Sequence, residues 1–308
     1  MTKTTLSETE VARAFRAGPH DTIAVPGGRL AAWRFGRGPD VVAIHGWPLH
    51  GATFRRIIPR LAERFTVHVV DLPGTGRTEW DPEARCGIEE HAATVRAFVD
   101  ARGLSRFVYL AHDSGAAITR LAAADDPRVA GHVLGNTEIP GHTPWLVALI
   151  VAIARIPGGT AAFLASMRIG ALRRSALGFG GCFRDPRYVD GDFGDWFVRP
   201  LLSSRAVAEG QMRLVHALDP RVFARLRDVH ARTRAPVLAV WGADDPFFPL
   251  ELARPMMRQL AGPASLVEIP RAKLFAHEDH PDAFVDACLP FLARALGEDD
   301  QAAAARLT

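Results

Sequence analysis

The stretch YLAHDSGAA, Tyr109 to Ala117, decides the fold class of this chain. It follows the apolar segment Phe107–Ala111 and precedes a helical pattern over Gly115–Ala124. A buried strand that enters a helix through so short a connection must turn sharply. The residue at the tip of such a turn is held in a strained backbone conformation and presents its side chain for reaction.

The register of the turn follows from the sizes of its flanking residues. The backbone folds so tightly that the residues two before and two after the tip must be small. Asp113 at the tip meets this requirement, with Ala111 and Gly115 beside it. Ser114 does not, because the bulky His112 would lie two positions before it. We therefore predict that Asp113 is a nucleophile, the alternative being a helix N-cap.

Apolar segments of strand type alternate with helical patterns along most of the chain. Continuously apolar runs such as VVAI, VHVV and VLAVW are typical of parallel strands buried on both faces. We expect eight strands, over Thr22–Pro26, Arg29–Phe35, Val41–His45, Thr66–Asp71, Phe107–Ala111, Val129–Asn136, Val237–Trp241 and Ser265–Ile269. Helices are expected between them, over Gly51–Arg64, Ile88–Arg102, Gly115–Ala124, Leu250–Leu260 and Pro281–Leu296. The alternation predicts an α/β protein with a mainly parallel sheet.

One section, 141–232, contains no convincing strand. Its helical patterns cover Trp145–Arg155, Ala161–Ser175, Ser204–Leu218 and Arg221–Arg232. We interpret it as a helical cap inserted between the sixth and seventh strands, so that the core consists of 1–140 and 233–308. The first ~20 residues and the alanine-rich tail after Leu296 are expected to be poorly packed ends.

Composition excludes several classes of protein. The 308 residues carry a net charge of only +3, without a basic block of the kind that binds nucleic acid. Three well-separated cysteines, Cys86, Cys182 and Cys288, argue against a disulfide framework or a zinc site. The longest apolar run, Trp145–Ala154, is too short to span a bilayer. We expect a cytoplasmic protein that needs no cofactor or metal and acts on a hydrophobic small molecule. The sequence leaves open whether it forms a homodimer.

Two further motifs follow predicted strands. In IHGWP, Ile44–Pro48, the backbone N–H of Trp47 can pair with that of Ser114 to form an oxyanion hole. His45 in the same motif suits a structural role in the turn. In WGADDPFFP, Trp241–Pro249, a carboxylate can orient a catalytic histidine.

The carboxylate expected in that orienting role is Asp245, whereas Asp244 suits a turn or cap. Glu138, after the sixth strand, is a weaker alternative that could instead be a hinge residue at the entrance to the cap.

Together these motifs resemble the α/β-hydrolase fold, in the branch of epoxide hydrolases, haloalkane dehalogenases and fluoroacetate dehalogenases. The resemblance covers Thr22 to Leu296 and includes DLPGTGRT at Asp71–Thr78. It implies that the Asp113 carboxylate attacks a saturated carbon, which leaves an ester on the enzyme for water to hydrolyse. The motifs are specific for the fold and not for the substrate.

The catalytic histidine of this branch is missing. It follows the last strand in a run like P-x-x-G-H-F, and in RAKLFAHEDHP, Arg271–Pro281, that register puts Lys273 at the glycine and Leu274 at the histidine. Leucine cannot accept a proton. His277 is the candidate substitute, although we expect it to face solvent at a helix start. The other histidines weighed for the role are His280, His112, His142, His216 and His230.

The residues expected around the substrate also depart from the family pattern. Dehalogenases often hold the halide with Trp or Arg after the nucleophile, where this chain has Ser114. Epoxide hydrolases usually protonate the epoxide with two cap tyrosines, and the cap offers only Tyr188. Trp145 and Trp196, with Tyr188 and Leu274, are expected to line the pocket.

Three functions therefore stay open. The first is an enzyme of the epoxide hydrolase or dehalogenase type with a displaced or absent base. The second is a non-hydrolytic cyclase, isomerase or lyase in which Asp113 is a general acid or base. The third is a ligand-binding pseudoenzyme.

Overall fold

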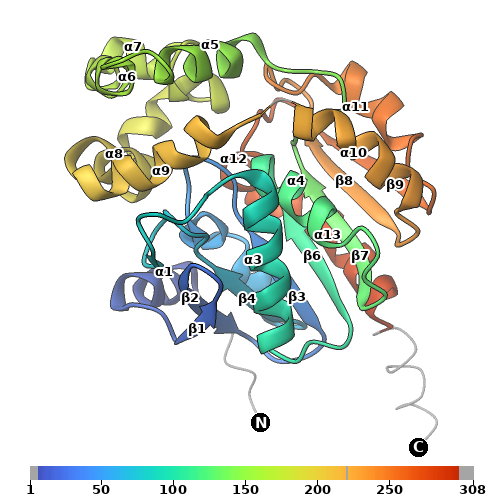
Figure 1. Ribbon diagram of the computed structural model, residues 1–308. Coiled ribbons are helices and arrows are strands. Elements are labelled where there is room, and N and C mark those ends of the chain that lie inside the picture. The colour runs from blue at the N-terminus through green and yellow to red at the C-terminus, as the bar shows by residue number, and fades with distance from the viewer. Residues whose placement is uncertain (1–5, 220, 298–308) are drawn as a thin grey trace, which may run out of the picture.

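The computed structural model describes residues 6–219 and 221–297, which form one large sheet with helices on both faces (Figure 1). The strand order is β1-β2-β4-β3-β6-β7-β8-β9, and the two-residue β5 pairs with β2. Pairings β1–β2, β2–β4 and β2–β5 are antiparallel and all the others are parallel. The strands are β1 (Asp21–Val25), β2 (Gly28–Phe35), β3 (Asp40–Ile44), β4 (Thr66–Val70), β5 (Glu79–Trp80), β6 (Phe107–Ala111), β7 (Val129–Gly135), β8 (Val237–Gly242) and β9 (Ala264–Ile269). The predicted mainly parallel α/β sheet is confirmed.

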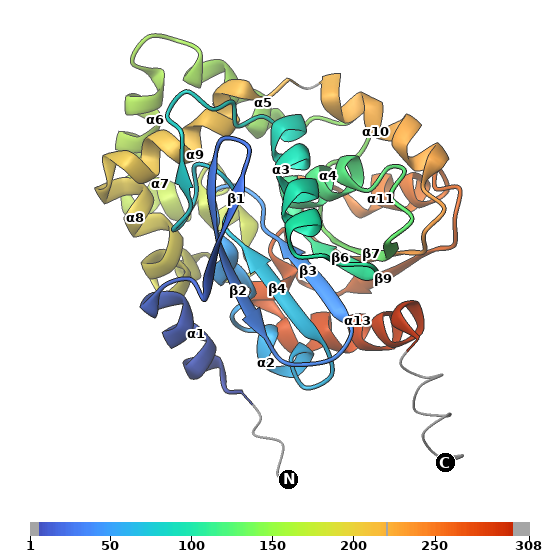
Figure 2. The ribbon, with the colours of Figure 1, turned by 60° about the horizontal axis from the view of Figure 1, so that its bottom comes forward.

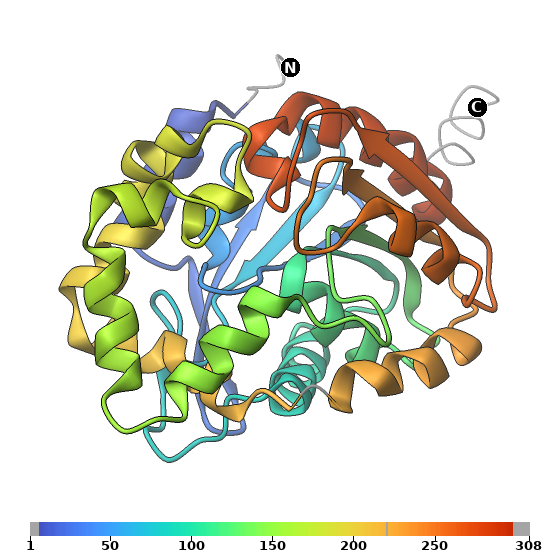
Figure 3. The same cartoon turned by 90° about the horizontal axis from the view of Figure 1, so that it is seen from above.

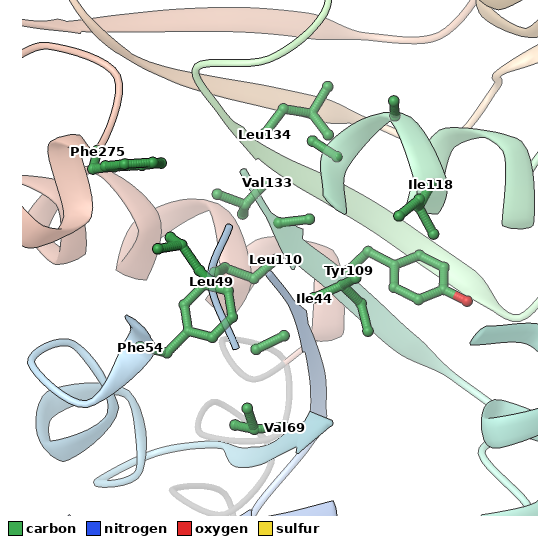
Figure 4. Packing of buried hydrophobic residues seen from close by; sticks show 14 of the residues in the cluster. Ile44, Leu49, Phe54, Val69, Tyr109, Leu110, Ile118, Val133, Leu134 and Phe275 are labelled. Atoms are coloured by element: carbon green, nitrogen blue, oxygen red, sulfur yellow. The ribbon is translucent and has the colours of Figure 1, made fainter. Parts of the chain in front are cut away.

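The central strands are apolar throughout because helices bury both of their faces. Every residue of β4, β6 and β8 is buried. Helices α3 (Ile88–Ala101), α4 (Asp113–Ala122) and α10 (Arg221–Arg232) lie on one side of the sheet, and α2 (Ile58–Leu61) and α13 (Pro281–Leu296) on the other (Figure 2). Figure 4 shows the resulting core, in which side chains from the central strands meet those of the loop after β3 and of α4.

The inserted segment forms a helical layer above the ends of the parallel strands (Figure 3). Its described residues, 141–219 and 221–232, contain no strand. The helices are α5 (Trp145–Ala154), α6 (Gly159–Met167), α7 (Gly170–Arg174), α8 (Arg199–Ser203) and α9 (Arg205–Ala217), with short turns at Phe179–Cys182, Pro186–Asp190 and Gly194–Val198. Arg221–Arg232, which we grouped with this segment, forms α10 and packs against α4.

Two local expectations need correction. The N-terminal segment is not poorly packed: Glu8–Ala17 forms α1, which buries Val11 and Phe15 and begins at a capping box between Ser7 and Glu10. The helix expected over Gly51–Arg64 is broken into η1 (Gly51–Phe54) and α2, since Pro59 favours a new helix start. The remaining helices are α11 (Leu250–Met257) and α12 (Ala276–Asp279), and the tail beyond Gly297 lies outside the described residues.

A buried ion cluster joins the core to the cap. Arg55, at the end of η1, donates from Nη1 to Glu278 Oε1 at 2.7 Å, and both side chains are almost fully buried. The Arg55 guanidinium also binds Asp192 of the cap and the hydroxyl of Tyr188. Burial raises the pKa of Glu278, and Arg55 opposes that shift. The charge of Glu278 therefore depends on Arg55.

Replacing Arg55 by alanine is expected to destabilise the protein by about 3–5 kcal/mol, because it leaves a buried carboxylate without its partner. Urea unfolding would measure the loss. The exposed pair Arg205–Glu209 provides the control, and Arg205→Ala should change stability by less than about 1 kcal/mol. Equal effects of the two substitutions would contradict this account of the cluster, whereas partial recovery in Arg55→Met with Glu278→Leu would support it.

Candidate active site

Asp113 occupies the turn between β6 and α4 in a conformation that is rare for a residue with a side chain. Its φ angle is 49°, in the left-handed region. The turn is held by the Asp113 N–H, which donates to the carbonyl of Asn136 at 2.7 Å. A Cβ on Gly115 would lie 2.4 Å from the carbonyl oxygen of His45, so only glycine fits there. The strain and the close packing match the geometry required at the tip of the turn.

Backbone donors converge on the Asp113 carboxyl group. The N–H of Trp47 lies 2.8 Å from Asp113 Oδ2 and 3.1 Å from the hydroxyl of Ser114. The backbone N–H of Ser114 also bonds to the carboxyl group. Gly46 makes this approach possible, since a Cβ there would lie 2.4 Å from Oδ2. The Trp47 and Ser114 donors therefore both act on the Asp113 carboxyl group, and their role as an oxyanion hole stays a prediction.

His45 supports this turn from within the fold. Its Nδ1 lies 3.0 Å from the carbonyl of Gly46, and the N–H of Leu72 donates to its Nε2 at 3.0 Å. Burial lowers the pKa of His45 to about 4. The neutral ring thus links the loops after β3 and β4, in keeping with the structural role expected for it.

Burial and neighbouring acids disfavour the charged form of Asp113. Burial raises the pKa of Asp113 to about 8, with a contribution from Glu138, while the N–H groups of Ser114 and Trp47 oppose the rise. Burial likewise raises the pKa of Asp245 to about 7. Three carboxyl groups therefore meet in one poorly hydrated region.

Asp245 is buried and fixed, whereas Asp244 is exposed. The Nδ2 of Asn136 donates to Asp245 Oδ2 at 2.7 Å, and the N–H of Phe247 donates to Oδ1 at 2.8 Å. Because Asn136 also accepts the Asp113 N–H, it ties the turn to the loop after β8. This environment favours Asp245 over Asp244 as the positioned carboxylate.

Two small cavities, of about 70 and 80 Å³, meet at Asp113 and Trp47. Leu274 lines the first, together with Cys182 and Phe275. Ser114, Glu138 and His142 line the second. The remaining walls are largely apolar and come from the FFP motif and the inner face of α5, through Leu146, Val147, Ile150, Val151, Phe247 and Phe248. Such walls suit an apolar ligand.

We expected His277 to face solvent, and this expectation is wrong. It is almost fully buried, with Nε2 2.7 Å from the hydroxyl of Thr53 and its ring centroid 4.1 Å from that of His112. α12 turns inward here because it packs beneath η1. Burial lowers the pKa of His277 to about 3, and neither cavity is lined by it. This environment does not support a role as general base.

Among the described residues, His142 is the histidine that lines a cavity beside Asp113. Its Nε2 lies 2.8 Å from the carbonyl of Phe247. A carbonyl can only accept, so Nε2 carries the proton that it donates, and Nδ1 is the ring nitrogen that is left to accept. His112 is enclosed by Phe54 and Phe275 within the scaffold.

Three residues expected to line the pocket lie elsewhere. The side chain of Trp145 is 65% exposed, on the outer side of α5. Tyr188 belongs to the ion cluster, where its hydroxyl lies 3.2 Å from Glu278 Oε2. Trp196 lines a separate hollow near α1 with His50 and Arg77. Two features of the sequence could have indicated the residues that do line the cavities: the apolar run WLVALIVAIA and the two phenylalanines of DDPFFP.

Within 6–219 and 221–297, no group of three or more His, Cys, Asp or Glu side chains could hold a metal ion. In the same part of the chain no helix has the length and apolar character needed to cross a bilayer.

Residues 41–287 match the model of the alpha/beta hydrolase family, and the chain belongs to that family. Haloalkane dehalogenase 2 of Mycobacterium tuberculosis is 29% identical over 265 residues, which cover 85% of this chain and 91% of that protein.

Solved structures of this fold are similar over nearly their whole length. An alpha/beta hydrolase fold protein from Burkholderia ambifaria superposes with a TM-score of 0.71 at 27% identity, covering 88% of this chain and 97% of that one. The epoxide hydrolase CorEH reaches 0.73 at 21% identity, covering 89% and 98%, which shows a common fold.

Proposed function

We propose that this α/β hydrolase uses the Asp113 carboxylate as a nucleophile toward a hydrophobic small molecule with an electrophilic saturated carbon, such as an alkyl halide or an epoxide. The observation that carries the proposal is the strained Asp113 at the junction of two apolar cavities, with Oδ2 held by the Trp47 N–H at 2.8 Å. The similarity to a haloalkane dehalogenase over most of both chains supports the same chemistry.

In the first step, Oδ1 of Asp113 forms a bond to the saturated carbon and the carbon–halogen or carbon–oxygen bond breaks. A halide leaves as an anion, and an epoxide oxygen takes a proton from water or a nearby acid. The product is an ester of Asp113. The step needs an ionised carboxylate and a well-placed electrophile, and the cavity walls supply the placement.

In the second step, water attacks Cγ of the ester. The negative charge that develops on the ester oxygen is stabilised by the N–H groups of Trp47 and Ser114, and collapse of the intermediate releases the alcohol and regenerates Asp113. The attacking water must lose a proton, and Leu274 neither accepts one nor attracts water to the first cavity. We propose that the ester therefore persists.

Alkylation of Asp113 should accelerate as pH rises, with a half-maximal rate near pH 8. The pKa of Asp113 is raised to about 8, so the reactive carboxylate is the minor form below that pH. At pH 6 about 1% would be ionised. Measuring the labelling rate from pH 6 to 9 with a bromoalkane gives the profile. Glu138→Gln removes a neighbouring acid and should move the midpoint to lower pH, whereas a rate independent of pH would contradict this account.

The same raised pKa favours a second candidate function. A carboxyl group that titrates near pH 8 can donate or accept a proton near neutrality, as a cyclase, isomerase or lyase requires. Such an enzyme would convert its substrate without a covalent intermediate and would not need the missing base.

Intact-mass measurement after exposure to a small bromoalkane or epoxide tests the proposal, with peptide mapping to locate the added group. One adduct on Asp113, absent from Asp113→Asn, is the expected result. Substrate conversion that requires Asp113 but leaves no adduct at any time would favour the second candidate. Tight reversible binding without conversion or an adduct would favour a pseudoenzyme.

A further inference from the structure

Exposed large apolar side chains are concentrated on one part of the cap. In the described residues, seven such side chains are more than a third exposed, and five lie between positions 145 and 177. We call these five the cap face: Trp145 (65% exposed), Leu149 (43%), Ile156 (60%), Ile169 (59%) and Leu177 (49%). They lie on or next to α5, α6 and α7, which run together along the top of the molecule in Figure 1.

The helix α5 is apolar on every side. Its inner side contributes Leu146, Val147 and Ile150 to the cavities at Asp113, while its outer side presents Trp145 and Leu149 to the surroundings. A helix on the surface of a globular protein ordinarily carries polar residues on its outer side. A clustered apolar exposure of this kind marks a surface that is covered by a partner or a membrane.

The segment that carries the cap face is rich in arginine. Residues 139–184 contain five arginines and no aspartate, glutamate or lysine. Arg155 donates to the carbonyl of Leu218 and Arg168 to that of Leu202, whereas Arg173 and Arg174 both pair with Asp190, which lies outside this segment. An apolar surface with basic residues and an exposed tryptophan has the composition of segments that lie in a membrane interface.

We propose that the cap face docks on an anionic lipid surface. A symmetric dimer through this face would bring the arginines of one copy toward those of the other, because such an interface pairs a patch with itself. Lipid phosphates would instead attract them, and the acyl region would cover the five apolar side chains. The helices of the described part need not cross the bilayer for this, since α5 would lie along its surface.

The cap face also shares one residue with the proposed site. Leu177 is about half exposed and lines the same cavity as Leu274 and Asp113. A hydrophobic molecule dissolved in the lipid could enter there without first crossing water. This part of the inference rests on the proposed function, whereas lipid docking does not depend on the chemistry at Asp113.

Co-sedimentation of the full chain with vesicles tests the docking. Vesicles of phosphatidylglycerol and phosphatidylcholine should bind the protein, and phosphatidylcholine alone should bind it at least about tenfold more weakly. Leu149→Gln with Ile156→Gln should weaken binding to the mixed vesicles by about tenfold or more. The matched control is Leu252→Gln with Val267→Gln, two exposed apolar residues of the core domain, which should leave binding unchanged.

Trp145 supplies an independent readout. Brominated lipids should quench part of the tryptophan fluorescence, and Trp145→Phe should lose that quenched part. Failure to bind mixed vesicles, equal binding to both vesicle types, or a dimer in light scattering that the Leu149–Ile156 variant dissolves would each overturn the proposal. Labelling of Asp113 in detergent-free buffer, measured in parallel, reports on the proposed function separately.

Discussion

Lys273→Gly combined with Leu274→His is expected to raise the rate of ester breakdown at Asp113 by about 10²–10⁴-fold, the usual contribution of a general base. Leu274 already lines the cavity that contains Asp113, so a ring at this position would face the ester. Asp245 is available to orient that ring, since Asn136 and the Phe247 N–H fix its carboxyl group. Glycine at 273 reproduces the backbone freedom of the family motif.

The rate would be measured by alkylating the protein, removing the reagent and following the loss of the added mass. Leu274→Asn with Lys273→Gly is the matched control, because asparagine is polar and of similar size but cannot act as a base near neutral pH. Adding Asp245→Asn should remove most of the gain. If the asparagine control accelerates breakdown as much as the histidine variant, hydration of the cavity and not proton transfer limits the reaction.

Gly46→Ala is expected to slow alkylation of Asp113 by about 10²-fold or more. The added Cβ would lie 2.4 Å from Asp113 Oδ2 and 2.5 Å from its Cβ, so the backbone at Asp113 or at Gly46 must shift, and the carboxyl group with it. A displacement of about 1 Å can reduce a rate by that factor. The nearest atoms all belong to the Asp113 side chain, but its Cβ moves only with the backbone, so some loss of stability is expected as well.

The labelling rate of Gly46→Ala would be compared with that of Gly191→Ala. At Gly191 the nearest atom to an added Cβ is 3.7 Å away, so this control should label at the normal rate. Circular dichroism would check that both variants are folded. Normal labelling of a folded Gly46→Ala would mean that the carboxyl group does not react from the position held by Trp47.

The turn at Asp113 could be predicted from sequence because its constraint is local. A sharp connection between a strand and a helix allows only small neighbours, and Ala111 and Gly115 supply them. The central strands could also be predicted from sequence, because burial on both faces makes β4, β6 and β8 continuously apolar. Leu274 could be placed beside Asp113 through the family motif, which fixes the register of the loop after β9.

The remaining parts of the site depend on contacts between distant segments. His277 is drawn into the interior by Thr53 of η1, which lies 224 positions earlier in the chain. The sequence suggests Tyr188 as a proton donor in the cap. In the structure, its hydroxyl is hydrogen-bonded to Arg55 and Glu278 instead. Neither partner is near in sequence. Because α5 is apolar throughout, its sequence does not indicate which of its sides faces the cavity.

His142 is the residue whose role the kinetic experiments would expose most clearly. It lies in the segment between β7 and the cap, and its position beside Asp113 depends on the carbonyl of Phe247, more than a hundred positions later. If a histidine other than one restored at position 274 activates water, this is the one that the cavity supports.

Asp113 is proposed to form an ester that this chain is slow to break. The most direct measurement is a time course of intact mass for the unmodified protein after a short exposure to excess bromoalkane, with halide release followed in the same sample. We expect one equivalent of halide to be released, one adduct to form on Asp113 and that adduct to persist after the reagent is removed. Continued release of many equivalents of halide, with unmodified protein at every time point, would contradict it; loss of that turnover in His142→Ala would then identify the base.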